Sequence, residues 1–307
     1  YNIFRVIRMS LIIGSHVSYK SNNQLVGSAR EAIGYGANTF MFYTGAPQNT
    51  NRGDIRSEFT DEAKKLMDDN GIDINNVIVH APYIVNLANM NNFNFSVSFL
   101  KEEVKRCSTL GIKYMVLHPG SAVNVSRIEA IENISKGLNL ILDNDYDVKI
   151  LLETMAGKGN EIGRSFEEIR NIIDKINFPD KIGVCLDTCH LNDAGYDIGN
   201  FDNVLDLFDN IVGIDKIYCV DINDSMNVIN SHKDRHANIG FGTIGFDNLL
   251  SVIYNKRLSD IPMILETPYV TKDDNSKEKI YPPYKYEIEM IKNKKFDSEM
   301  INKIREG

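Results

Sequence analysis

The sequence predicts an α/β fold in which eight parallel strands close into a single (β/α)8 barrel, the TIM barrel. The chain has 307 residues, and barrels of this kind commonly reach such a length as one domain. Eight short runs of aliphatic and β-branched residues recur along it, which is the number of strands that the barrel requires. A longer amphipathic segment follows each run, and apolar strands that alternate with helices indicate a parallel sheet covered on its outer face.

The expected strands are short and bounded by polar segments. In chain order they are Leu11–Gly14, Thr39–Tyr43, Val77–Val79, Tyr114–Leu117, Val148–Leu152, Ile182–Leu186, Ile217–Val220 and Met263–Leu265. The expected helices between them include Asp61–Asn70, Phe95–Leu110 and Ser165–Ile176. Ser165 followed three residues later by Glu168 is the capping-box pattern that begins a helix. No low-complexity stretch or Pro/Gly-rich linker divides the chain, so residues 9–307 are expected to form one domain.

Residues 1–8 precede Met9 and the first expected strand. They contain two arginines but no long apolar core and no cleavage site, so we expect no secretory signal. We interpret them as a native extension or as residues added to the native chain. The four cysteines, at positions 107, 185, 189 and 219, form no CxxC pair, which favours reduced thiols in an intracellular protein. A cytoplasmic location is expected, with a nucleoid or a viral factory as alternatives.

The composition is that of an ordinary globular protein, with 43% hydrophobic and 25% charged residues. No apolar run approaches the roughly 18 residues that a membrane span needs, so no membrane partner is expected. The net charge of −8 argues against a nucleic-acid partner. Divalent cations bound by the acidic residues would cancel much of this charge and concentrate positive charge at one site, so DNA is not excluded.

The residues at the ends of the expected strands indicate a metal site. In chain order the runs finish at His16, Tyr43, His80, His118, Glu153, Asp187, Asp221 and Glu266. From the third strand on, every one of these is a type of residue that binds metals. Because the carboxyl ends of all strands of a parallel barrel meet at one mouth, these residues are expected to share one pocket there. His16 is expected to line the pocket floor without binding metal.

Further potential ligands follow the sixth and seventh strands. His190 lies three residues after Asp187, and Asp234-Arg235-His236 lies in the loop after the seventh strand. Alternate residues of an extended segment face the same way, so Asp234 and His236 could bind one ion while Arg235 points elsewhere. No role is assigned to His232, which lies in a polar loop.

Histidine and carboxylate ligands without thiolate suit zinc or manganese in an open catalytic site. Several ions in one mouth suit the hydrolysis of a phosphodiester, because metal ions generate hydroxide and offset charge on the attacking and leaving oxygens. Glu153 is well placed to bridge two ions.

Taken together, these segments resemble the endonuclease IV family of abasic-site endonucleases. The resemblance runs from about residue 11 to residue 297. Its motifs are Gly14-Ser15-His16-Val17-Ser18, His80-Ala81-Pro82-Tyr83, Leu117-His118-Pro119-Gly120, Leu152-Glu153-Thr154, Leu186-Asp187-Thr188-Cys189-His190, Asp193-Ala194-Gly195-Tyr196-Asp197, Asp234-Arg235-His236 and Leu265-Glu266-Thr267-Pro268. The joint match is much more specific than any single motif.

The resemblance implies a TIM barrel that binds three zinc ions. By resemblance, His80 and His118 hold the first ion, and Glu153 bridges it to the second. Asp187 and Glu266 join Glu153 at the second ion, and Glu153 and Glu266 are assigned catalytic roles. The third ion is held by His190, Asp234 and His236.

The same resemblance implies the reaction and the partner. The family cleaves the phosphodiester 5′ to an abasic site during base excision repair, leaves a 3′ hydroxyl and trims blocked 3′ ends. The partner is therefore double-stranded DNA with abasic sites, and the chain is expected to act as a monomer. Flipping the damaged nucleotide out of the duplex is easiest where a base is missing.

DNA contacts are expected from loops at the barrel mouth. Tyr83 and Gln48 match loop positions that fill the gap in the base stack. Arg235 is the candidate for phosphate contact in the metal-binding loop, and Arg52, Lys158 and Arg164 are further candidates. For each of these basic residues a solvated surface role is the alternative.

One position departs from the family pattern. The family has a histidine ligand to the second ion at the start of the motif that reads Asp221-Ile222-Asn223-Asp224 here. With Asp221 in its place the second site would have only oxygen ligands, which shifts the preference toward Mn²⁺ or Mg²⁺. We therefore expect an active enzyme with an altered metal preference at this site.

Two other functions remain open at this point. A metal-dependent sugar isomerase or epimerase uses a similar barrel, but it does not need a third His/Asp cluster. A lesion-binding protein that has lost hydrolysis through Asp221 is the alternative without catalysis. Fold alone cannot decide among these, because barrels of this type support many reactions.

Overall fold

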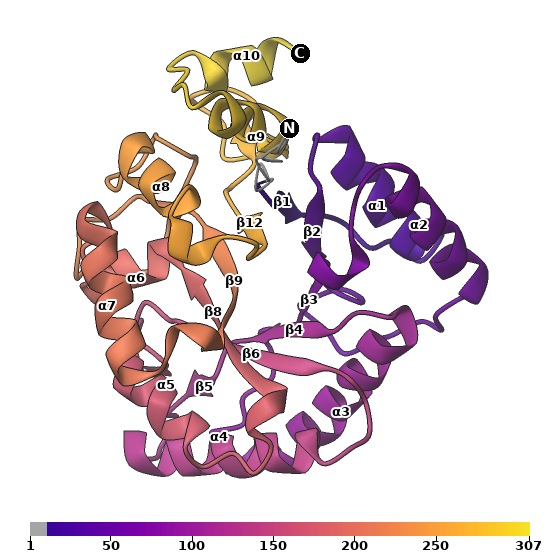
Figure 1. The fold of residues 1–307 in the computed structure, drawn as a ribbon, viewed down its shortest axis with the longest axis vertical. Coiled ribbons are helices and arrows are strands. Elements are labelled where there is room, and N and C mark those ends of the chain that lie inside the picture. Colours follow the sequence, from indigo (N-terminus) through magenta and orange to yellow (C-terminus); the bar gives the residue numbers. More distant parts are fainter. Residues whose placement is uncertain (1–10) are drawn as a thin grey trace, which may run out of the picture.

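The computed structural model describes residues 11–307, and these form the predicted (β/α)8 barrel. Eight parallel strands close into a ring in the order β1-β12-β9-β8-β6-β4-β3-β2 (Figure 1). Their bounds are β1 Ile13–His16, β2 Thr39–Phe42, β3 Ile78–His80, β4 Tyr114–Leu117, β6 Lys149–Glu153, β8 Ile182–Asp187, β9 Ile217–Ile222 and β12 Met263–Leu265. Every expected strand is present, and the largest displacement is at β1, which begins two residues later than expected. The expected boundary between residues 8 and 9 lies outside the described residues.

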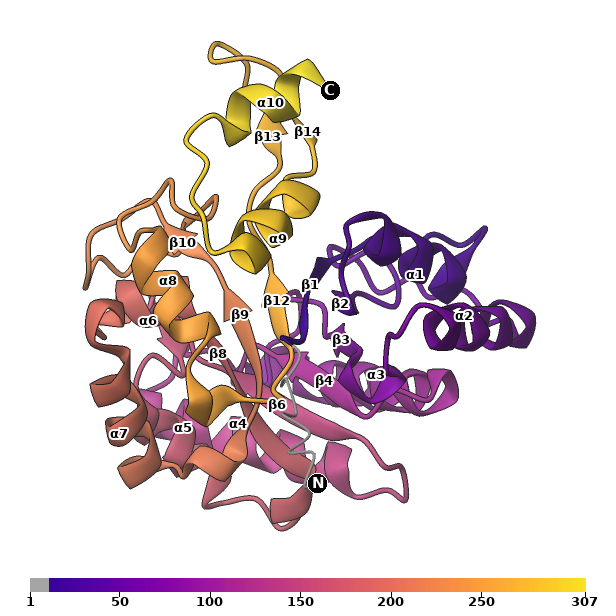
Figure 2. The ribbon, with the colours of Figure 1, turned by 45° about the horizontal axis from the view of Figure 1, so that its top comes forward.

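Helices surround the ring of strands (Figure 1). They are α1 Gln24–Gly34, α2 Ser57–Asp69, α3 Phe93–Leu110, α4 Arg127–Leu142, α5 Phe166–Ile173, α6 Thr188–Ala194, α7 Phe201–Ile211, α8 Phe246–Ile253, α9 Tyr284–Asn293 and α10 Met300–Glu306. Three two-stranded sheets join the loops: β5 Gly120–Ser121 with β7 Glu161–Ile162, β10 Asp224–Ser225 with β11 His236–Ala237, and β13 Val270–Thr271 with β14 Lys279–Tyr281. The segment with β13, β14, α9 and α10 projects from one side of the barrel beyond β12 (Figure 2).

The start of α5 differs in one detail from the capping-box prediction. The Ser165 side chain caps the helix as expected, because its Oγ accepts a hydrogen bond from the main-chain N–H of Glu168 at 3.3 Å. The Glu168 carboxylate does not return to the Ser165 N–H. It accepts instead from the N–H of Gly163 at 2.9 Å and binds Arg127 of α4. The reciprocal half of the box is therefore replaced by a contact that ties α5 to the β7 loop and to α4.

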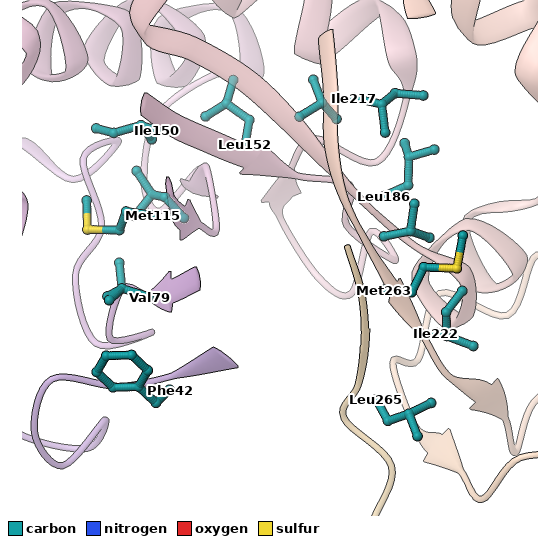
Figure 3. Packing of buried hydrophobic residues seen from close by; sticks show 14 of the residues in the cluster. Phe42, Val79, Met115, Ile150, Leu152, Leu186, Ile217, Ile222, Met263 and Leu265 are labelled. Atoms are coloured by element: carbon teal, nitrogen blue, oxygen red, sulfur yellow. The ribbon is translucent and has the colours of Figure 1, made fainter. Parts of the chain in front are cut away.

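Successive side chains along each strand point alternately into two apolar layers. The outward-facing residues pack against the helices, and Figure 3 shows several of them on successive strands, such as Met115, Ile150, Leu152 and Leu186. The inward-facing residues form a separate layer that closes the barrel, which we call the barrel floor. It comprises Met41, Ile78, Val116, Leu151, Cys185, Cys219 and Ile264.

Glu287 of α9 is a buried carboxyl that fastens the C-terminal segment to the barrel. It accepts hydrogen bonds from Thr267 Oγ1 at 2.5 Å, from the Ile239 N–H at 3.0 Å and from Asn238 Nδ2 at 3.1 Å. Burial raises its pKa from 4.5 to about 7, although these hydrogen bonds act in the opposite direction. A carboxyl with a raised pKa keeps a proton in the folded state that the unfolded state has lost.

The free energy of unfolding is therefore expected to contain a contribution that decreases as the pH rises from about 4.5 to about 7. Glu287→Gln should remove this contribution. Across this pH range, the free energy of unfolding of the variant should therefore increase relative to that of the wild type by about 1–3 kcal/mol. Chemical denaturation at several pH values measures the difference. Glu289→Gln, on the exposed side of the same helix, is the control. Parallel pH profiles for wild type and Glu287→Gln would contradict the expectation.

Candidate metal centre

The two-residue period of the strands places a ring of functional side chains above the barrel floor. Alternate residues of a strand face the same side, so the residue two positions after each floor residue points into the mouth. These residues are Tyr43, His80, His118, Glu153, Asp187, Asp221 and Glu266. The succession of potential ligands in the sequence thus follows from a common register across the barrel.

Main-chain carbonyl groups orient three of the histidines in the same way. His80 Nδ1 lies 2.7 Å from the carbonyl oxygen of Ala81, His190 Nδ1 lies 2.9 Å from that of Thr154, and His236 Nδ1 lies 3.1 Å from that of Glu266. In each case Nδ1–H donates to the carbonyl oxygen. The lone pair of the neutral imidazole then belongs to Nε2, which points toward carboxylates.

The first group of potential ligands consists of His80, His118 and Glu153. Glu153 Oε2 lies 3.1 Å from Nε2 of His80 and 3.1 Å from Nε2 of His118. His80 and Glu153 are buried, whereas the His118 side chain is 32% exposed and faces the mouth. This arrangement matches the set that the sequence resemblance assigned to the first ion.

The second group consists of His190, Asp234 and His236. Asp234 Oδ1 lies 3.0 Å from His190 Nε2 and 3.5 Å from His236 Nε2. The three residues meet as expected, but not through an extended backbone, because Asp234 has a φ of +55°. Pairing of β11 with β10 instead places His236, and Arg235 is exposed.

Glu153 and Asp187 connect the two groups. Glu153 Oε1 lies 3.1 Å from His190 Nδ1, and Asp187 Oδ2 lies 3.8 Å from His236 Nε2. Asp187 is the N-cap of α6, since its Oδ1 accepts from the His190 N–H at 2.7 Å, and its Oδ2 accepts from Asn223 Nδ2 at 2.7 Å. The Asp187 carboxylate is held in place by these two hydrogen bonds.

Asp221 and Glu266 have different neighbours. The Asp221 carboxylate contacts two thiols of the barrel floor: Cys185 Sγ lies 3.4 Å from Oδ2, and Cys219 Sγ lies 3.7 Å from Oδ1. Glu266 Oε1 lies 3.4 Å from Nε2 of His16, which lines the pocket as expected. The structure thus brings Asp221 together with two thiols that the sequence interpretation had left outside the site.

The pocket favours positive charge on His118 and His190, whereas burial lowers the pKa of His16. Burial alone would lower the pKa of His118 and His190, but the Glu153 carboxylate raises that of His118, and Asp187, Asp234 and Glu153 raise that of His190 well above the usual value. Conversely, burial would raise the pKa of Glu153, yet His118 and its neighbours hold it well below the usual range. Burial raises the pKa of Asp187. A site that attracts protons to these lone pairs also attracts cations.

Several buried polar atoms of this pocket lack a hydrogen-bond partner. They include Glu153 Oε1, His236 Nε2 and His16 Nε2. Buried polar atoms are normally satisfied, so these atoms indicate a missing partner. Because their neighbours are carboxylate oxygens and imidazole Nε2 atoms, the donor set fits divalent metal ions with oxygen and nitrogen ligands.

Asn223 and Asp193 support the site, although neither residue was predicted to have a role. Asn223 Oδ1 accepts from the Glu266 N–H at 3.0 Å, while its Nδ2 binds Asp187. Asp193 accepts from Ser225 Oγ at 2.7 Å and from the Asp234 N–H at 2.9 Å, so it fixes the loop that supplies Asp234. Both residues lie within the quoted motifs, and their adjacency to potential ligands was the available signal.

The predicted DNA-contacting residues are exposed, with one exception. Tyr83 is 56% exposed, and Gln48, Lys158, Arg164 and Arg235 are also exposed. Arg52, expected as a phosphate contact, is instead buried: its side chain is 7% exposed and its Nε lies 2.7 Å from Glu103 Oε1. The assignment of Arg52 to phosphate is therefore wrong, because its charge is used inside the protein.

The fold and the site define a TIM-barrel enzyme of the xylose isomerase-like type, and the family model of that description matches residues 29–294. A protein of Acholeplasma laidlawii named "Probable endonuclease 4" is 55% identical over 299 residues, which cover 96% of this chain and 99% of the relative. The crystal structure of endonuclease IV from Thermus thermophilus has a TM-score of 0.77 and 28% identity, covering 92% of this chain and 97% of that chain. The chain belongs to the endonuclease IV family, which confirms the resemblance predicted from the sequence.

A D-tagatose 3-epimerase-like protein shares the fold with a TM-score of 0.66 and 22% identity, covering 95% of this chain and 98% of that chain. At this identity the similarity concerns the fold alone, and it gives no support to a sugar epimerase. Within residues 11–307, no helix has the length and apolarity needed to cross a membrane.

Proposed function

We propose that the protein is a metal-dependent endonuclease that hydrolyses the phosphodiester 5′ to an abasic site in double-stranded DNA, leaves a 3′ hydroxyl and trims blocked 3′ ends. The observation that supports it most is the convergence of histidine Nε2 atoms on shared carboxylates at the barrel mouth, since such a set binds several cations in one pocket. Membership of the endonuclease IV family agrees with this reaction.

Three divalent ions are proposed, with zinc as the expected metal. His80, His118 and Glu153 would hold one, and His190, Asp234 and His236 another. The remaining ion would lie between Glu153, Asp187 and Glu266, and Asp221 occupies the position of the family's histidine ligand to this ion. Bound divalent ions would supply activated water at neutral pH and would neutralise charge on the phosphodiester oxygens.

The protein's own residues have separate roles in this proposal. Glu153 and Glu266 are the catalytic carboxylates, since they line the pocket in which the phosphodiester would react. Tyr83 and Gln48 would contact the DNA around the lesion, and Arg235 its phosphates. We further propose that the protein acts as a monomer inside the cell.

Metal binding is expected to release protons. The carboxylates of the pocket raise the pKa values of His118 and His190, so protons compete with a metal ion for the lone pairs of these histidines. Zinc added to metal-free protein should therefore release protons near pH 7, and the apparent affinity should fall as the pH decreases. Calorimetry in buffers of different ionisation enthalpy measures this release. A binding enthalpy that is independent of the buffer would contradict the expectation.

The function is tested with metal-free protein and a duplex oligonucleotide that carries one stable abasic analogue. Zinc, manganese or magnesium is added back separately, and the undamaged duplex is the control. The expected result is a single cut directly 5′ to the lesion, with no cut in the control. Binding of the lesion without cleavage under any metal would favour a lesion-binding protein, and neither binding nor cleavage would refute the proposal.

A further inference from the structure

Two thiols lie directly beneath Asp221, and their position follows from the register of β8 and β9. Cys185 pairs with Cys219 across these strands, and Asp187 pairs with Asp221 one layer above. All four side chains point to the barrel interior, and both thiols are fully buried. Neither Cys185 nor Cys219 has a role in the proposed function.

The spacing of these groups fits a metal ion. The sulfur atoms lie 3.4 and 3.7 Å from the Asp221 oxygens, and one ligand atom from each residue lies within 4.8 Å of the others. A tetrahedral zinc ion with bonds of about 2.3 Å to sulfur and about 2.0 Å to oxygen sets its ligand atoms roughly 3.5–3.8 Å apart. The contacts around Asp221 are close to this spacing.

The acidic groups around Asp221 also favour the binding of a cation. Its carboxylate is fully buried, and within residues 11–307 it accepts no hydrogen bond from a lysine, an arginine or a main-chain N–H. The nearby acidic groups are Glu153, Glu266 and Asp187, which add negative charge. In such surroundings the ionised form of the carboxylate needs a bound cation to compensate its charge.

We propose that Cys185 and Cys219 join Asp221 in binding a thiophilic divalent cation at the barrel floor. Each thiol loses its proton to solvent as its sulfur–metal bond forms, and no oxidation is involved. The donor set then contains sulfur, which favours zinc over Mn²⁺ or Mg²⁺ at this position, in contrast to the all-oxygen site expected from the sequence. The inference rests on the proposed function only for the presence of divalent ions, and not on DNA cleavage.

Cadmium is the probe, because thiolate–cadmium bonds absorb in the near ultraviolet whereas oxygen and nitrogen ligands do not. Reduced, metal-free protein is titrated with cadmium, and bound cadmium is counted by mass spectrometry. The expected result is a charge-transfer band whose final amplitude corresponds to one ion with two thiolate ligands per chain, whatever the total number of cadmium ions bound. The double variant Cys185→Ser/Cys219→Ser should lose this band.

Two matched variants serve as controls. Cys107→Ser replaces a buried thiol on α3, away from the pocket, and should keep the band. Cys189→Ser replaces the thiol near Asp187 and His236, and should also keep it. Loss of the band in Cys189→Ser, or its survival in the double variant, would assign the absorbing ion elsewhere and overturn the inference.

A second measurement uses the wild-type protein and the Cys189→Ser variant, and it remains decisive if the double variant does not fold. Cadmium-113 NMR distinguishes sulfur-ligated from oxygen- and nitrogen-ligated ions by a large downfield shift. A sulfur-type resonance that is present in both proteins supports the site, whereas one that disappears in Cys189→Ser assigns the ion to that thiol. Bound cadmium with neither a charge-transfer band nor a downfield resonance means that the thiols only donate hydrogen bonds to Asp221. The site at the floor would then be refuted, while the cleavage assay would still decide the proposed function separately.

Discussion

Replacing Glu153 by glutamine is expected to reduce abasic-site cleavage by at least about 10³-fold, because a metal ion contributes several kcal/mol to stabilising a hydrolytic transition state. Glu153 Oε2 lies 3.1 Å from Nε2 of both His80 and His118, and Oε1 lies 3.1 Å from His190 Nδ1. One carboxylate therefore contacts histidines of both groups. Glutamine keeps the size but removes the charge, so bound metal should decrease together with activity.

The measurement combines single-turnover cleavage with metal analysis of the purified variant. Glu132→Gln, on the exposed side of α4, is the matched control and should retain both activity and metal content. If Glu153→Gln kept its metal and cleaved at a rate close to that of the wild type, Glu153 would have no part in the centre.

Replacing Glu103 by alanine is expected to lower the free energy of unfolding by about 3–5 kcal/mol, the usual cost of leaving one partner of a buried ion pair alone. Glu103 of α3 is fully buried between Arg52 Nε at 2.7 Å and Thr44 Oγ1 at 2.8 Å. Arg106 of the same helix donates to the Thr44 carbonyl oxygen at 3.0 Å and to that of Gly53 at 2.9 Å. These contacts hold residues 44–53, the loop that contains Gln48.

The same variant is expected to bind abasic DNA more weakly, because a loosened loop must be ordered on binding. The effect should appear in KM more than in kcat, and the metal content should not change. Glu102→Ala is the control, since Glu102 is exposed and its contact with Lys105 is 3.9 Å long; its effect should stay within about 0.5 kcal/mol. A destabilised Glu103→Ala with wild-type KM would limit the network to a structural role.

The strands and most of the predicted site could be derived from the sequence because both depend on short-range periodicity. Potential ligands such as His80 and Glu153 follow apolar runs directly, and a parallel barrel brings strand ends together whatever their separation along the chain. The backbone conformation of Asp234 could not be derived from the sequence: it is left-handed, and the Asp234 N–H donates to Asp193, 41 residues earlier in the chain.

Contacts between distant segments account for what was missed. In the sequence, Arg52 looks like a basic loop residue that contacts DNA. Only the packing of α3 shows that Glu103 neutralises the charge of its side chain. The proximity of Cys185 and Cys219 depends on the register between β8 and β9, which one sequence does not display. The placement of Asp221 over these thiols is the result of that register.

The orientation of the three histidines has an evolutionary consequence. Their Nδ1–H groups donate to main-chain carbonyl oxygens, those of Ala81, Thr154 and Glu266. In many metal sites the partner is a carboxylate side chain, which a single substitution can delete. Here the acceptor is a main-chain carbonyl group, which no point mutation can remove. The tautomer of these histidines is therefore maintained wherever the fold is maintained. Substitutions among the ligands, such as the aspartate at position 221, can then accumulate in one lineage without changing the orientation of the remaining imidazole rings.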